Sequence, residues 1–283
     1  MIAVATPPTA GHPAARSPRN AAWLWVLPPV VVIAALVVYP LAHVVVRTFQ
    51  DKAERPAGFA TWWATLTDAA VLRALWTTVE VATLSTLGCV VTGTLLALVL
   101  AFVPFPGAPL AVRLIESVVS FPSFLIPLAL GVLLGPVGVV GSVIGAGSFT
   151  TSLWGVVLAE TAFYAPFVVR PVLAAFTAFP SVQIDVAGSL GAGPLTIVRR
   201  VILPAATPAL ASSASLTFLL TLNEFGIVLF TGAKDVITLP MLIYTRSMVG
   251  LDFATAAVLA TVQLAVSLAV YLGYRTLLRR ERE

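Results

Sequence analysis

The sequence predicts an all-α protein that crosses a membrane about six times, and three observations lead to this fold class. Of the 283 residues, 59% are apolar and only 10% are charged, whereas a soluble domain usually has about a quarter charged residues. The mean hydropathy is +1.01. The stretch from Ser117 to Ala159 contains no Asp, Glu, Lys or Arg, and it is longer than the ~20 residues that one helix needs to cross a bilayer.

Six apolar segments are long enough to serve as membrane-spanning helices. Their expected ranges are 21–46, 74–103, 117–134, 152–178, 205–230 and 253–274. The glycine-rich stretch 135–147 is expected to break the long uncharged run, because repeated glycine weakens a helix. Residues 1–20 contain four prolines and no apolar periodicity, so they predict a disordered tail. A single transmembrane domain is expected over 21–278, followed by a short tail at 279–283.

The distribution of basic residues predicts the orientation of the chain. With the N-terminus inside, the cytoplasmic segments hold ten of the 16 Lys and Arg residues and the outer loops hold six. Both termini are therefore expected in the cytoplasm. The net charge of +4 is explained by this topology and does not indicate a nucleic-acid partner.

Several classes of site and of protein are disfavoured by the side chains present. One cysteine, Cys89, and two histidines, His12 and His43, give no metal cage, disulfide framework or redox pair, and Cys89 is expected in the core. They also argue against a membrane-embedded enzyme. No GxxxxGK[ST] phosphate-binding loop occurs in the sequence. An ion-driven secondary transporter remains an alternative, although such a transporter predicts a cluster of mid-membrane carboxylates, and the sequence shows no clear cluster of this kind.

The segment 180–204 follows the fourth expected span and predicts two short helices separated by glycine. Ser181 is expected to cap the first helix, and Asp185 to lie near its positive end. Gly191 suits a left-handed stop, and Pro194 suits the first turn of the next helix. The second helix carries an apolar stripe with two arginines opposite, which is typical of a helix at the inner membrane surface. The stripe consists of Leu195, Val198 and Ile202, and the arginines are Arg199 and Arg200.

At this segment the sequence resembles the transmembrane subunit of binding-protein-dependent ABC importers. The family signature is Glu-Ala-Ala, three residues, Gly, nine residues, and Ile-x-Leu-Pro. The matching positions here are Asp185, Val186, Ala187, Gly191, Val201, Leu203 and Pro204. Asp185 replaces the usual Glu and has a shorter reach, while Val186 and Val201 keep apolar surfaces.

The resemblance implies a specific set of partners and no catalytic residue in this chain. The short loop helix would couple to a cytoplasmic ABC ATPase dimer, which would supply the ATPase activity. A second permease subunit, identical or homologous, and an extracytoplasmic solute-binding protein would complete the importer. The implied location is the bacterial cytoplasmic (inner) membrane, with the lipid bilayer as solvent, and no cofactor is implied.

A second resemblance concerns the substrate. Residues 222–244 are similar to permeases for 2-aminoethylphosphonate and, more distantly, to those for sulfate or molybdate, iron and polyamines. Asn223 and Glu224 are candidate residues of the translocation path, and a structural bond from Glu224 to a neighbouring helix is the alternative. Two other carboxylates are expected in ion pairs, Glu80 with Arg73 and Glu116 with Arg113.

Overall fold

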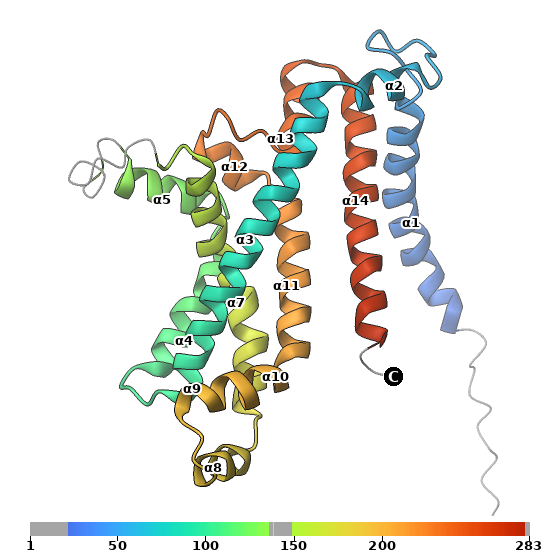
Figure 1. Cartoon of the computed structure of the whole chain (residues 1–283). Coiled ribbons are helices and arrows are strands. Elements are labelled where there is room, and N and C mark those ends of the chain that lie inside the picture. Colours follow the sequence, from blue (N-terminus) through green and yellow to red (C-terminus); the bar gives the residue numbers. More distant parts are fainter. Residues whose placement is uncertain (1–21, 136–137, 139–148, 281–283) are drawn as a thin grey trace, which may run out of the picture. The chain divides into compact units, whose positions relative to one another are not determined.

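The computed structural model describes residues 22–135, 138 and 149–280, and these residues are helical apart from turns and one isolated bridge between Gln50 and Pro56 (Figure 1). The expected tail 1–20 and nearly all of the glycine-rich stretch 135–147 lie outside the described residues. The elements are α1 Ala22–Arg47, α2 Ala60–Leu66, α3 Ala69–Phe102, α4 Ala108–Ser117, η1 Val118–Ser120, α5 Leu125–Leu134, α7 Leu153–Thr177, α8 Ser181–Ser189, α9 Pro194–Ile197, η2 Val198–Ile202, α10 Leu203–Ala205, α11 Thr207–Leu222, α12 Gly226–Thr231, α13 Leu239–Tyr244, η3 Thr245–Val249 and α14 Phe253–Arg280.

The chain divides into two units, residues 1–46 and 47–283, and each is described by itself. In the first unit, α1 is a long apolar helix with three internal prolines, Pro28, Pro29 and Pro40. Its apolar part from Trp25 to Arg47 is 23 residues long, enough to cross a bilayer. All other helices belong to the second unit.

Four of the predicted spans are single helices in the structure, and the number reaches six if each of two bent helix pairs counts as one span. Within the described residues, α1, α3, α7 and α14 are each long and apolar enough to cross a membrane. The third predicted span, 117–134, is instead a pair formed by residues 108–120 and α5, bent by 110°. The bend lies at Phe121–Phe124, where Pro122 cannot donate a helical backbone hydrogen bond.

The fifth predicted span, 205–230, is also interrupted. The helix α11 ends at Leu222, and α12 begins only at Gly226. At its other end, α11 meets residues 194–205 at an angle of 68°. The last helix runs to Arg280, two residues beyond the predicted end of the domain at 278, and residues 281–283 of the expected tail lie outside the described chain.

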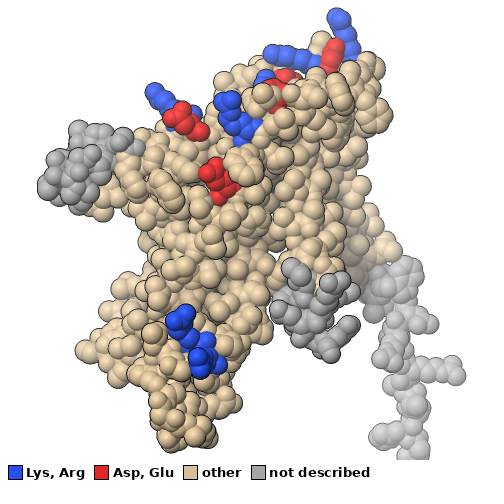
Figure 2. Space-filling model, viewed as in Figure 1, with Lys and Arg blue, Asp and Glu red and all other residues tan. Residues whose placement is uncertain are grey.

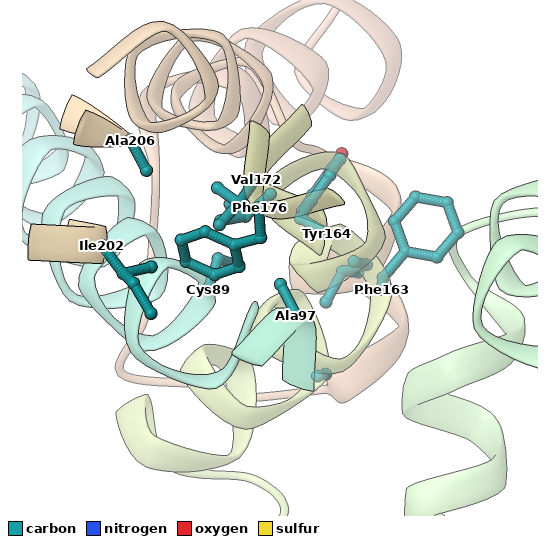
Figure 3. Packing of buried hydrophobic residues seen from close by; sticks show 11 residues of the cluster. Cys89, Ala97, Phe163, Tyr164, Val172, Phe176, Ile202 and Ala206 are labelled. Carbon is teal, nitrogen blue, oxygen red and sulfur yellow. The ribbon is translucent and has the colours of Figure 1, made fainter. Parts of the chain in front are cut away.

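The core of the second unit lies where α3, α7 and α11 pack together. Gly93 of α3 allows close approach, because a Cβ there would lie 2.7 Å from Cβ of Val168. The main cluster of buried residues joins α3, α7 and the α9–α11 region (Figure 3). Figure 3 shows Cys89 and Ala97 of α3 near Phe176 of α7 and Ile202 of η2. Cys89 is fully buried, as expected for a small core residue.

Candidate functional site

The loop between α7 and α11 forms the exposed helix that the sequence predicts. The helix α8 covers Ser181–Ser189, but its N-cap is Pro180, so Ser181 is the first helical residue and does not cap it. Asp185 lies beyond the first turn, where the positive end of the helix dipole no longer favours a carboxylate strongly. Both expectations were wrong because the helix begins one residue earlier than the capping pattern suggests.

The turn after α8 is the one that the sequence predicts. Gly191 has a φ of +85°, in the left-handed region that glycine enters without steric cost. Its backbone N–H donates to the carbonyl of Gly188 at 2.9 Å, and the N–H of Ala192 donates to the carbonyl of Ala187 at 3.0 Å. These two bonds satisfy carbonyls at the end of α8 and reverse the chain toward α9.

One face of α8, continued by its C-cap Leu190, is apolar and open. Val182, Val186 and Leu190 are 66%, 52% and 83% exposed. Asp185 is also exposed, whereas Ala187 is half-buried. Three large apolar side chains on one short projecting helix are costly in water, so this surface is suited to a protein partner.

The second half of the signature anchors the loop to the core. Pro194 occupies the first turn of α9, as predicted. Ile202 is only 3% exposed and belongs to the main core cluster, which also includes Phe176. The residues of the expected apolar stripe therefore do not share one surface, since Leu195 stays 69% exposed while Ile202 packs on protein instead of lipid.

The segment η2 at Val198–Ile202 has π-helical hydrogen bonding, which sequence periodicity does not predict. This wider turn changes the face of the helix on which the later side chains lie. Val201 and Leu203 are half-buried and Pro204 is exposed.

The break between α11 and α12 brings Glu224 into contact with three other elements. The hydroxyl of Tyr164 on α7 donates to Oε2 of Glu224. Ser123, in the bend of the third span, donates to Oε1 at 3.3 Å, and the backbone N–H of Ile227 donates to the same oxygen at 2.9 Å. Glu224 is 8% exposed, so it connects the breaks of the third and fifth spans from inside the protein.

The neighbouring Asn223 faces a different set of groups and is exposed. Its Oδ1 accepts hydrogen bonds from Nε2 of Gln263 at 3.0 Å and Oγ of Ser267 at 3.2 Å, both on α14. Gln263 Nε2 also donates to the carbonyl of Leu222 at 2.9 Å. The end of α11 is thus tied to α14 by uncharged polar groups.

Glu160 is a second buried carboxylate in the same region. It precedes Tyr164 by one helical turn on α7, is fully buried, and neither carboxylate oxygen has a hydrogen-bond partner among the described residues. The contacts of Tyr164 and Ser123 with Glu224 were not predicted, because the three residues lie far apart in the sequence. The sequence feature that could have drawn attention to Tyr164 is its hydroxyl, one helical turn after the mid-span Glu160.

The two expected ion pairs are wrong. Glu116 pairs with Arg170 of α7, at 2.9 Å, instead of with Arg113. Glu80 and Arg73 are both described, and no ion pair joins them. Seven residues, nearly two helical turns, separate Arg73 from Glu80, which is too far for the three- or four-residue spacing that brings helical side chains together. Within the described chain no group of three or more His, Cys, Asp or Glu side chains could hold a metal ion.

Comparison with known sequences finds one family over most of the chain. Residues 90–283 match the family described as "Binding-protein-dependent transport system inner membrane component". PhnU of Salmonella typhimurium (strain LT2), provisionally described as a permease protein for 2-aminoethylphosphonate transport, is 36% identical over 260 residues, covering 89% of this chain and 91% of PhnU. The molybdenum transport permease protein ModB of Mycobacterium tuberculosis (strain ATCC 25618 / H37Rv) is 32% identical, covering 94% of this chain and 97% of ModB.

A third relative transports a different class of solute. The spermidine/putrescine transport permease protein PotC of Escherichia coli (strain K12) is 27% identical, covering 87% of this chain and 91% of PotC. Among solved structures, a chain of a bacterial alginate ABC transporter has the same fold, with a TM-score of 0.76 at 19% identity, covering 93% of this chain and 96% of that chain. A chain of the inward-facing MetNI methionine ABC transporter gives a TM-score of 0.58 at 22% identity, covering 74% of this chain and 94% of that chain.

Proposed function

Because the chain belongs to the family of binding-protein-dependent transport system inner membrane components, we propose that it forms half of the translocation path of an ATP-driven importer for 2-aminoethylphosphonate. As a member of this family it is a multi-pass inner-membrane protein. The observation that carries the coupling part of the proposal is the exposed helix α8, which ends in the left-handed turn at Gly191.

We infer that α8 transmits the movement of a cytoplasmic ATPase dimer to this subunit. Val186 and its neighbours on the exposed face would fill a groove on the ATPase, and Asp185 would contribute a polar contact at the rim. The half-buried Ala187, Val201 and Leu203 and the adjacent Pro204 would connect this contact to the core. A force on α8 would then reach α11 through the segment α9–η2–α10.

The break after α11 is the part of the chain that we propose to line the translocation path. Asn223 is exposed at the interruption, and its Oδ1 accepts from Gln263 and Ser267 of α14. Its Nδ2 donates to the carbonyl of Leu219 at 2.8 Å, so the second N–H of the amide is left for a hydrogen-bonding solute. Glu224 follows it in the chain, is buried and accepts hydrogen bonds from three donors, so its proposed role is to fix the break. Interrupted spans whose backbone faces a polar path are a common construction in transporters.

The substrate is proposed from sequence similarity. PhnU is the more similar relative, at 36% identity, against 32% for ModB and 27% for PotC. A phosphonate, an oxyanion and a polyamine differ in charge, so an uptake experiment in which they compete can identify the class of substrate. Sulfate, iron and other small solutes remain alternatives of the same transporter type.

An ion-driven transporter is the second candidate, because the structure buries two carboxylates, Glu224, which accepts from the hydroxyl of Tyr164, and Glu160, one helical turn before Tyr164 on α7. The ATP-driven proposal requires a separate ATPase, a binding protein and a second permease subunit.

The proposed function is tested by uptake of radiolabelled 2-aminoethylphosphonate into proteoliposomes. These contain this chain with its partner permease subunit and ATPase, and the binding protein is added outside. Uptake is expected to require internal ATP and the binding protein, to persist when the proton gradient is collapsed, and to resist competition by molybdate or spermidine. Uptake that follows the proton gradient without ATP would establish the ion-driven mechanism instead, and competition by molybdate would reassign the substrate.

A further inference from the structure

Arg199 and Arg200 form an exposed basic pair on η2, between the coupling helix and α11. In the described part of the chain, the ion pairs involve Arg47, Arg170 and Arg246, and neither Arg199 nor Arg200 takes part in one. Basic side chains on the lower part of the visible face have no acidic neighbour in that view (Figure 2). The pair is therefore free to bind an anion from outside the chain.

The backbone that carries the two arginines is fixed from the opposite side. Ile202 and Ala206 are 3% and 2% exposed and belong to the main core cluster. Figure 3 shows both residues in this cluster, next to Phe176. Because η2 is anchored in this way, the guanidinium groups occupy a defined position relative to α11.

The direction of the segment places it across the end of a membrane span. Residues 194–205 meet α11 at 68°, so the segment runs mainly sideways where α11 begins. Leu195, on the same segment, is 69% exposed. A short sideways helix with exposed arginines and an exposed leucine is suited to the boundary between headgroups and acyl chains.

We propose that Arg199 and Arg200 bind the phosphate of anionic phospholipid headgroups and so hold the segment 194–205 at the membrane surface. This inference rests on the proposed function in taking α11 as a membrane span. The planar guanidinium group donates two parallel hydrogen bonds to a phosphate, which an ammonium group cannot do. Lipid is favoured over the ATPase as partner because α8 projects beyond α9 and α10, away from α11 (Figure 1).

The test measures lipid binding without measuring transport. The assembled importer is placed in nanodiscs of phosphatidylcholine alone or with increasing phosphatidylglycerol, and its melting temperature is recorded at each composition. Phosphatidylglycerol is expected to raise the melting temperature of the wild-type importer. The double variant Arg199→Gln/Arg200→Gln should need more phosphatidylglycerol for the same rise, roughly fivefold more for each arginine removed.

Two further variants separate charge from geometry. Arg199→Lys/Arg200→Lys should keep part of the response, because the charge remains while the paired hydrogen bonds are lost. Arg73→Gln/Lys234→Gln removes two exposed cations elsewhere, one on α3 and one in the loop between α12 and α13, and should leave the response unchanged. Inorganic phosphate in solution should not replace the lipid, since it lacks the anchoring acyl chains.

An unchanged phosphatidylglycerol response in Arg199→Gln/Arg200→Gln would overturn the proposal. Loss of the ATPase from this variant in phosphatidylcholine alone, with the lipid response intact, would show that the arginines contact the ATPase instead. If the double variant does not assemble, Arg200→Gln alone is measured against the same criterion. A failed uptake experiment would refute the proposed function without altering the lipid result.

Discussion

At the residue scale, Gly191 is the position where backbone conformation alone decides the shape of the proposed coupling loop. A Cβ at this residue would meet no atom within 4 Å, so the cost of a side chain comes only from the φ of +85°. Gly191→Val should cost ~1–2 kcal/mol locally or force the turn open. We expect normal membrane abundance but reduced co-purification of the ATPase and reduced uptake, measured in the same cells.

Gly193→Val provides a matched control for this prediction. Gly193 is exposed, and a Cβ there would also meet no atom within 4 Å, but its φ is −70°, which any residue adopts. This variant should retain ATPase binding and uptake. Equal losses in both variants would show that added bulk in the loop, and not the left-handed turn, causes the defect.

The contact between Tyr164 and Glu224 gives a second residue-scale prediction. Tyr164→Phe removes one of three donors to a buried carboxylate, so it should destabilise the subunit by ~1–3 kcal/mol. Thermal unfolding in detergent measures this loss. The double variant Tyr164→Phe/Glu224→Gln should lose less unfolding free energy than the two single variants together, because both substitutions break the same hydrogen bond.

Tyr271→Phe is the control for Tyr164→Phe, since Tyr271 is 44% exposed on α14. Its melting temperature should match that of the wild type. Additive losses for Tyr164→Phe and Glu224→Gln would mean that the two side chains stabilise the protein independently.

At the scale of elements, hydropathy predicts the spans but not the breaks within them. The helices α3, α7 and α14 lie where the apolar segments predict them, because length and composition alone decide whether a helix can cross a bilayer. The bend of 110° near Pro122 and the interruption at Asn223–Phe225 were not predicted. Both depend on contacts between distant segments, such as Ser123 with Glu224, which a local pattern does not contain.

In the candidate site, too, features set by neighbouring residues were predicted, whereas features set by contacts between distant segments were not. The left-handed turn at Gly191 was predicted, because it depends on the residue type and its immediate neighbours. The burial of Ile202 and the pairing of Glu116 with Arg170 were not predicted, because each requires the packing of α7 against other elements. The cap of α8 was wrong by one residue, within the usual uncertainty of helix ends.

One hydrogen bond joins α3 to α13 and gives an element-scale prediction. The buried hydroxyl of Thr78 accepts from the backbone N–H of Leu239 at 2.7 Å and donates to the carbonyl of Ala74 at 2.6 Å. Thr78→Val keeps the shape but leaves that N–H without an acceptor, so it should destabilise the subunit by ~1–3 kcal/mol. Thr78→Ser should restore most of the melting temperature.

Thr83→Val is the control on the same helix. The hydroxyl of Thr83 is exposed and donates only to the carbonyl of Val79, within α3. Its loss should change the melting temperature little. If Thr78→Val unfolds no earlier than Thr83→Val, the start of α13 does not depend on this bond.

At the scale of the whole molecule, the distribution of charge relates the fold to the proposed direction of coupling. The upper part of the visible face carries both basic and acidic side chains, whereas the lower part carries basic ones alone (Figure 2). The proposed coupling helix α8 lies at the lower end in the same view (Figure 1). With α8 inside, the inner segments of the sequence hold ten of the 16 Lys and Arg residues, so the positive-inside rule predicts that the end with α8 faces the cytoplasm, where an ATPase would be available.

The orientation can be measured because the chain has a single cysteine, Cys89, which is fully buried and should not react with a maleimide. Ser189→Cys places a thiol at the end of α8, and Lys52→Cys places one in the loop between α1 and α2, both at exposed positions. In spheroplasts, a membrane-impermeant maleimide should label Lys52→Cys but not Ser189→Cys. After membrane disruption both should react, while the wild-type chain stays unlabelled. Labelling of Ser189→Cys in intact spheroplasts would place α8 outside the cell, where no ATP-driven partner could reach it, and would contradict the coupling role of α8.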